Sequence, residues 1–235
     1  MYLIGEKIEF EHVPKTGGKA LLDAFAMCDE LLPVALQAKG HHVGHARREF
    51  VSDRRFHLPG FRFGIVRDPV EWYRSLWKYL ETPDCGVFEI DPAIGHPFRP
   101  IIRWLRRGVP CSDFVGELVH KADGFYSAMA ADYLGKADLI GRTDNLGPAG
   151  LAACRAVGIE LTESERWIIG NPRRVNVSRP IDTAGDATIS DDVVRSVQSI
   201  ESAGVAMFSR AGVYTETGSP VPVAIPRRRK RRRGR

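Results

Sequence analysis

The segment from Glu11 to Ala20, which reads EHVPKTGGKA, constrains the fold of this 235-residue chain more than any other. An alternating, β-prone run from Ile8 to Val13 leads into it, and a helical pattern from Ala20 to Phe25 follows it. A strand that passes through a glycine turn into a helix directs backbone N–H groups toward an anion. A lysine in the turn adds a mobile positive charge. The segment therefore predicts a cradle for the phosphate or sulfate of a nucleotide.

This cradle differs from the loop of nucleoside triphosphatases. That loop has a glycine, four further residues and then Gly-Lys-Ser/Thr, in which the hydroxyl group binds magnesium. Val13 and Ala20 stand at the positions of the first glycine and of the hydroxyl residue. A plain tight turn between a strand and a helix is the alternative interpretation of the segment.

Length, cysteine spacing and hydropathy bound the class of protein. A chain of 235 residues suits one medium domain with a sizeable core. The four cysteines are far apart and show no Cys-x-x-Cys pair, so we expect reduced thiols, a reducing compartment and no metal site. The first seven residues lack the apolar core of a signal peptide, and no run is long enough to span a membrane. These features predict a cytoplasmic protein.

The positive net charge of the chain arises from its last nine residues. Arg227–Arg235 carry eight of the 34 basic residues, which leaves 26 basic against 29 acidic residues elsewhere, a net charge of −3. Prolines at 220, 222 and 226 precede this block and indicate an extended linker. We therefore expect one domain over residues 1–215 and a linker with a basic disordered tail over 216–235. The tail suits contact with a polyanion, and a purely solubilising tail is the alternative.

Strand and helix patterns alternate along the predicted domain. The expected strands cover residues 7–13, 61–66 and 137–141. The expected helices cover residues 19–30, 70–80, 97–107, 112–121, 146–157 and 191–204, the last with Ser190 as its N-cap. Strands separated by helices imply a parallel sheet covered on both faces. The predicted fold class is α/β, with a single P-loop-like three-layer domain whose central parallel sheet is flanked by helices.

A second strand–turn–helix unit lies at residues 63–77. Arg67 follows its strand directly, where open parallel sheets bind ligands, and Asp68 and Pro69 suit the N-cap and the first turn of the helix. Ser75 lies two helical turns further and shares a face with the start of the helix. An arginine and a hydroxyl that converge in this way suit a phosphate. The alternative is a local ion pair between Arg67 and Asp68 that only caps the helix.

Both units together resemble the sulfotransferase superfamily, which uses 3′-phosphoadenosine 5′-phosphosulfate (PAPS). The resemblance rests on Pro14–Gly18, on Val66–Pro69 and on Ser75, and it is closest to the carbohydrate sulfotransferases of the uronosyl 2-O type. It implies that the first loop binds the 5′-phosphosulfate, through Lys15, Thr16, Gly17, Gly18 and Lys19. It also implies that Arg67 and Ser75 hold the 3′-phosphate.

Weaker similarities extend the resemblance to residue 178. The Gly-His pair at Gly44 and His45 resembles an element in which a histidine acts as the base, and His42 or Glu49 is the alternative base. The run from Ile140 to Asp144 resembles a later strand that ends in Gly-x-Thr-Glu, with an aspartate in place of the glutamate. Asn176 and Ser178 resemble an Asn-x-Ser element on the nucleotide side.

The resemblance implies transfer of a sulfuryl group from PAPS to a hydroxyl or amine of an acceptor, with a carbohydrate as the first expectation. Catalysis then rests on positioning and electrostatics, with Lys15 at the bridging oxygen, His45 as the base and no metal. One departure is the pair Lys19-Ala20, which replaces the hydroxyl residues that usually follow Gly-Gly. The alternatives are a P-loop kinase-like phosphotransferase and a non-catalytic protein of the same fold that binds a nucleotide or polyanion.

Overall fold

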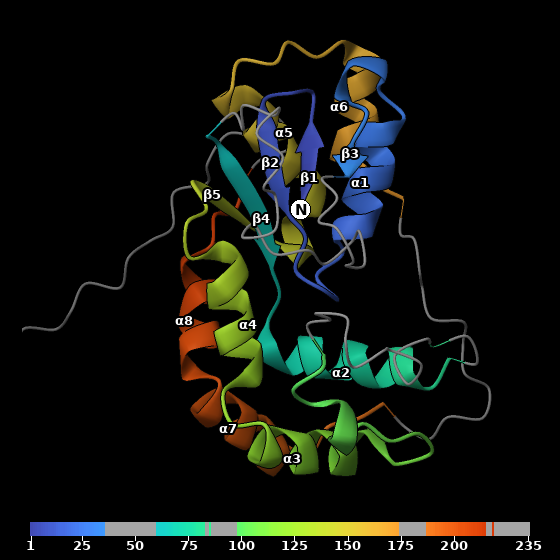
Figure 1. Ribbon diagram of the computed structural model, residues 1–235, viewed down its shortest axis with the longest axis vertical. Helices are drawn as coiled ribbons and strands as arrows, with labels where there is room; N and C mark the ends of the chain where they lie inside the picture. The colour runs from blue at the N-terminus through green and yellow to red at the C-terminus, as the bar shows by residue number, and fades with distance from the viewer. Residues whose placement is uncertain (36–59, 83–84, 86–97, 174–186, 215–217, 219–235) are drawn as a thin grey trace, which may run out of the picture.

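Five strands form one mixed sheet in the order β3-β1-β2-β4-β5 among the residues that the structure describes (Figure 1). The structure, a computed structural model, describes residues 1–35, 60–82, 85, 98–173, 187–214 and 218. The strands are β1 (Tyr2–Ile4), β2 (Ile8–Glu11), β3 (Val34–Ala35), β4 (Arg62–Val66) and β5 (Leu139–Arg142). β2, β4 and β5 are parallel neighbours, whereas β1 runs antiparallel to both β2 and β3.

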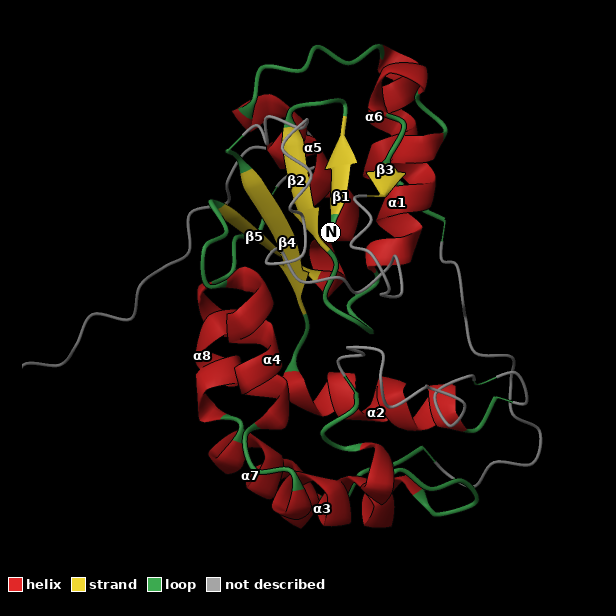
Figure 2. Ribbon diagram, viewed as in Figure 1, coloured by secondary structure: helices red, strands yellow, loops and turns green. Residues whose placement is uncertain are grey.

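The helices are α1 (Gly18–Ala26), α2 (Pro69–Leu80), α3 (Cys111–Lys121), α4 (Phe125–Leu134), α5 (Leu146–Ala156), α6 (Glu163–Gly170), α7 (Asp191–Ile200) and α8 (Ser202–Arg210). Helices α1, α5 and α6 lie alongside the sheet, whereas α2, α3, α4, α7 and α8 form a second group below it in the view of Figure 2. Phe10, Phe63 and Ile65 of the sheet pack with α1, α5 and α6 in one buried cluster. Val13 and Val66 belong to a second cluster, which is built mainly from α2, α3, α4 and α7. None of the helices in the described ranges is long and apolar enough to cross a membrane.

The α/β class and the parallel pairing of the three expected strands agree with the structure. Its sheet is mixed rather than fully parallel, because the short β1 and β3 add an antiparallel edge that the sequence analysis missed. Helices α4 and α6 were also missed, although Thr162 and Glu165 form a capping box at the start of α6. The expected tail at 216–235 lies outside the described residues, apart from Gly218.

Two of the expected helices are wrong as predicted. Residues 98–107 form turns and one short 3₁₀ segment, Ile102–Trp104, instead of a helix over 97–107. Pro100 interrupts the first part of this range, since proline has no N–H to donate and clashes with the preceding turn. The expected helix over 191–204 is two helices, α7 and α8, which meet at Glu201. Ser190 caps α7 as predicted.

Glu201 explains the break between α7 and α8. Its side chain is fully buried and accepts hydrogen bonds from the backbone N–H groups of Tyr126 and Ser127, at 3.1 and 2.8 Å. The hydroxyl groups of Ser127 and Tyr73 also donate to this carboxylate. Tyr126 and Ser127 lie in the first turn of α4, whose exposed N–H groups favour a negative charge. Glu201 therefore joins the C-terminal helices to α4 and to α2.

We expect Glu201→Ala to lower the free energy of unfolding by about 3 kcal/mol, because it leaves several buried donors without an acceptor. Urea unfolding followed by circular dichroism measures this change. The matched control is Glu117→Ala, since Glu117 forms surface ion pairs with Arg106 and Lys121. That control should cost less than about 1 kcal/mol. Equal losses in the two variants would contradict the anchoring role of Glu201.

Candidate nucleotide site

The loop between β2 and α1 turns through two left-handed residues. Lys15 has φ +65° and Gly17 has φ +83°, and α1 begins directly after Gly17. Thr16 is fully buried, and its hydroxyl donates to the carbonyl oxygen of Val13 at 2.8 Å, which closes the loop on itself. A Cβ atom at Gly18 would lie 2.3 Å from Cδ2 of His12, so this position accepts only glycine without a shift.

Side chains from outside the loop hold three successive carbonyl groups of the loop. Nε1 of Trp72 donates to the carbonyl of Pro14 at 2.8 Å, and Nη1 of Arg67 donates to that of Lys15 at 3.1 Å. The Thr143 hydroxyl lies 2.9 Å from the carbonyl of Thr16. Within the described ranges, no hydrogen bond takes up the N–H groups of Lys15 and Gly17. The loop therefore presents unused backbone donors, as an anion cradle requires.

The two loop lysines point to different places. The Lys15 ammonium lies over the ring of Tyr79 in α2, 4.1 Å from its centroid. Burial, and then the charge of nearby Arg67, lowers the pKa of this ammonium to about 8. Lys19 is exposed and pairs with Asp23 at 3.3 Å, one turn further along α1. Lys15 is therefore the lysine that lies beside the second motif.

The second motif has the local structure that its sequence predicts. Asp68 caps α2 by accepting the N–H of Glu71 at 3.1 Å, and Pro69 is the first residue of the helix. The Tyr126 hydroxyl bonds to both the N–H and the carbonyl of Arg67, which fixes the backbone where β4 ends. Burial lowers the pKa of the Arg67 guanidinium, although neighbouring Glu71 opposes this effect. Arg67 is thus held by two distant segments, at its backbone by Tyr126 and at its guanidinium by the Lys15 carbonyl.

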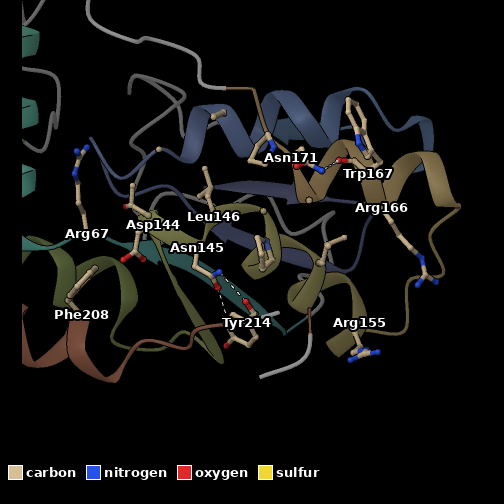
Figure 3. A pocket seen from close by; sticks show the side chains of 18 of the residues that line it. Arg67, Asp144, Asn145, Leu146, Arg155, Arg166, Trp167, Asn171, Phe208 and Tyr214 are labelled. Carbon is tan, nitrogen blue, oxygen red and sulfur yellow. Dashed lines mark hydrogen bonds between the residues drawn. The ribbon is translucent and has the colours of Figure 1, made fainter. Parts of the chain in front are cut away.

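A pocket of about 1620 Å³ opens beside these motifs (Figure 3). Gly17, Ala20, Arg67 and Ser75 line it at one end, and Arg155, Arg166 and the exposed Trp167 line it further away. Figure 3 shows Arg67 on the opposite side of this pocket from Trp167. Cavities that bind small ligands commonly enclose 300 to 1,000 Å³, so the volume suffices for a nucleotide.

The structure brings some of the predicted site residues together and leaves others apart. Gly17, Arg67 and Ser75 share the pocket, and Lys15 joins them through its hydrogen bond to Arg67. Thr16 and Gly18 shape the loop from within, whereas Lys19 lines a smaller hollow with His12 and Asp23. His45, the alternative bases His42 and Glu49, and the pair Asn176 and Ser178 lie outside the described residues.

Several residues that shape the site were not assigned to it from the sequence. The ring of Trp72 lies in the core, but its N–H also supports the loop. Thr143 was part of a recognised element, yet its hydroxyl bonds to the first loop and to the Val66 carbonyl. Tyr79 and Tyr126 carried no signal that separates them from ordinary core aromatics. Asp144 pairs with Arg142, in the same turn.

The described residues also bear on cysteines and metals. All four cysteines are buried free thiols, and burial raises the pKa of Cys154 to about 12. Across the ranges that the structure describes, no cluster of His, Cys, Asp or Glu has the geometry to hold a metal ion.

Comparison with known proteins gives no relative. No protein family, curated protein or solved structure matches the chain.

The lowered pKa of Lys15 has a measurable consequence. Folding favours the neutral amine, so the unfolded chain binds more protons between pH 8 and 10.5, and the contribution of Lys15 to stability rises with pH across that window. We expect competitive acetylation of Lys15, followed by mass spectrometry, to show a midpoint near pH 8. Arg67→Ala should raise this midpoint, because it removes a like charge and exposes the amine. A wild-type midpoint above pH 10 would contradict the burial of the ammonium group.

Proposed function

We propose that this chain is a PAPS-dependent sulfotransferase with a P-loop-like three-layer domain. The observation that carries the proposal is the hydrogen bond from Arg67 to the Lys15 carbonyl, which joins two motifs 52 residues apart into one site. Ser75 lines the same pocket as Arg67 and Gly17. The spacing of both motifs supports a ligand with one anionic group at the loop and a second at α2.

The residues of the loop suit the phosphosulfate end of such a ligand. The N–H groups of Lys15 and Gly17 have no acceptor among the described residues, and the first turn of α1 adds further donors. PAPS supplies an activated sulfuryl group, whose transfer leaves negative charge on the departing nucleotide. We assign the stabilisation of this charge to the Lys15 ammonium, which lies on the α2 side of the loop, over the ring of Tyr79. The half-buried position of Lys15 strengthens its electrostatic effect.

The remaining roles are proposals from the sequence. Arg67 and Ser75 hold the 3′-phosphate, and Asn176 and Ser178 add contacts on the nucleotide side. His45 takes the proton from a hydroxyl or amine of the acceptor, for which a carbohydrate is our first choice. The tail at Arg227–Arg235 suits a polyanionic acceptor, since dense positive charge attracts sulfated or phosphorylated polymers. We place the protein in the cytoplasm.

A kinase-like phosphotransferase is the second candidate, because it shares the strand–loop–helix cradle. It requires a hydroxyl group after the lysine to bind magnesium. Ala20 stands there and lines the pocket, so its methyl group faces the space that this hydroxyl would fill. A binding protein without catalysis is the third candidate, and nucleotide titrations distinguish all three.

Isothermal titration with adenosine 3′,5′-bisphosphate, PAPS and ATP with magnesium tests the proposal. We expect the 3′-phosphorylated ligands to bind more tightly and without magnesium. Arg67→Ala should weaken bisphosphate binding about 100-fold, since charge-assisted hydrogen bonds contribute roughly 1.5–3 kcal/mol each. Arg166→Ala removes the same charge at the other end of the pocket and should change affinity little. Preference for ATP with magnesium, or full affinity in Arg67→Ala, would refute the assignment.

Ala20→Ser returns a hydroxyl group to the loop. Because Ala20 lines the pocket, we expect PAPS to bind several-fold more tightly, in proportion to one added hydrogen bond of about 1 kcal/mol. Ala26→Ser, in the last turn of α1, controls for the effect of serine on the helix. A gain confined to ATP with magnesium would instead favour the kinase-like candidate.

A further inference from the structure

One face of α2 forms a charged wall of the pocket beyond the predicted phosphate ligands. Arg67, Glu71, Arg74, Ser75 and Lys78 all line the pocket. Their spacing of three, four or seven residues places the helical members on one side of α2. Three cations therefore line the pocket together with Ser75, whereas the sequence motif accounts only for Arg67.

Arg74 is held in this wall at two points. Its Nε donates to the carbonyl oxygen of Ala187 at 3.2 Å, and its Nη1 bonds to the Glu71 carboxylate. Glu71 also lies 3.9 Å from Nη2 of Arg67, so one carboxylate lies between the two guanidinium groups. Among the described residues, no hydrogen bond takes up Nη2 of Arg74. Arg74 is thus fixed in place and retains donors for a ligand.

The charge of the expected ligand requires a second cation. A phosphate monoester carries about −1.5 to −2 charges near neutral pH. Arg67 supplies one positive charge and Ser75 supplies only a neutral hydroxyl, while the Glu71 carboxylate, which bonds to Arg74 and lies 3.9 Å from Arg67, offsets one charge of the pair. The guanidinium of Arg74, next to Ser75 in the chain, supplies the missing charge in a fork that suits phosphate oxygens.

We propose that Arg74 is the second guanidinium of the 3′-phosphate subsite and sets its selectivity for 3′-phosphorylated nucleotides. This inference rests on the proposed function. If Arg74 serves only to connect α2 with Ala187, its loss should affect all nucleotides equally. If it binds the 3′-phosphate, its loss should affect only ligands that carry this group.

Titration of the full-length chain with adenosine 3′,5′-bisphosphate and with adenosine 5′-monophosphate distinguishes these roles. Arg74→Gln retains a donor toward Ala187 but removes the charge. We expect it to weaken bisphosphate binding about tenfold and to leave monophosphate binding within twofold of wild type. Arg74→Lys, which restores the charge without the fork, should recover part of the loss. Arg155→Gln, in the distal wall of the same pocket, is the matched control and should leave the selectivity unchanged.

The outcomes separate this inference from the proposed function. A wild-type chain that does not prefer the bisphosphate overturns both. A wild-type preference that survives Arg74→Gln overturns only the role of Arg74. An equal loss for both ligands assigns Arg74 a structural role and also overturns the inference. Melting curves verify that the variants are folded. If Arg74→Gln is unstable, the bisphosphate and monophosphate affinities are compared in Arg74→Lys instead.

Discussion

Three hydrogen bonds to successive carbonyl groups hold the loop between β2 and α1, and the geometry of the candidate site depends on them. Trp72, Arg67 and Thr143 donate to the carbonyls of Pro14, Lys15 and Thr16. A left-handed lysine costs roughly 1–2 kcal/mol, so Lys15 needs such partners to keep its φ of +65°. With the carbonyls engaged on the protein side, the N–H groups are left for a ligand. The two motifs therefore depend on each other for their geometry.

Local signals explain why the two strand–turn–helix units were predictable from sequence. Asp68 and Pro69 specify the start of α2 within three residues, and the cap that they predict is present. Gly17 supplies a left-handed residue at the start of α1. Each signal acts through its own neighbours in the chain, so no knowledge of distant packing was needed. The positions of Arg67 and Ser75 on one pocket follow from these local units.

Distant contacts explain most of what the sequence did not reveal. Trp72 and Tyr126 resemble ordinary core residues, and only the folded chain places their polar atoms on the loop and on Arg67. Glu201 interrupts a good helical pattern because α4 needs its carboxylate. Some missed features had local signals, namely the proline at 100 and the capping box of Thr162 and Glu165 at the start of α6.

The contacts of Glu201 have a consequence for the order in which the molecule assembles. Both motifs are complete once residue 75 has been synthesised, but the backbone of Arg67 is fixed by Tyr126, and the first turn of α4 is anchored by Glu201. The carboxylate is separated from Tyr73 by 128 residues, so this connection closes a long loop. A nascent chain that has not yet been synthesised as far as Glu201 carries both motifs but lacks the carboxylate that anchors α4. The geometry of the candidate site therefore belongs to the finished domain, because a chain that ends before residue 201 contains both motifs but lacks this anchor.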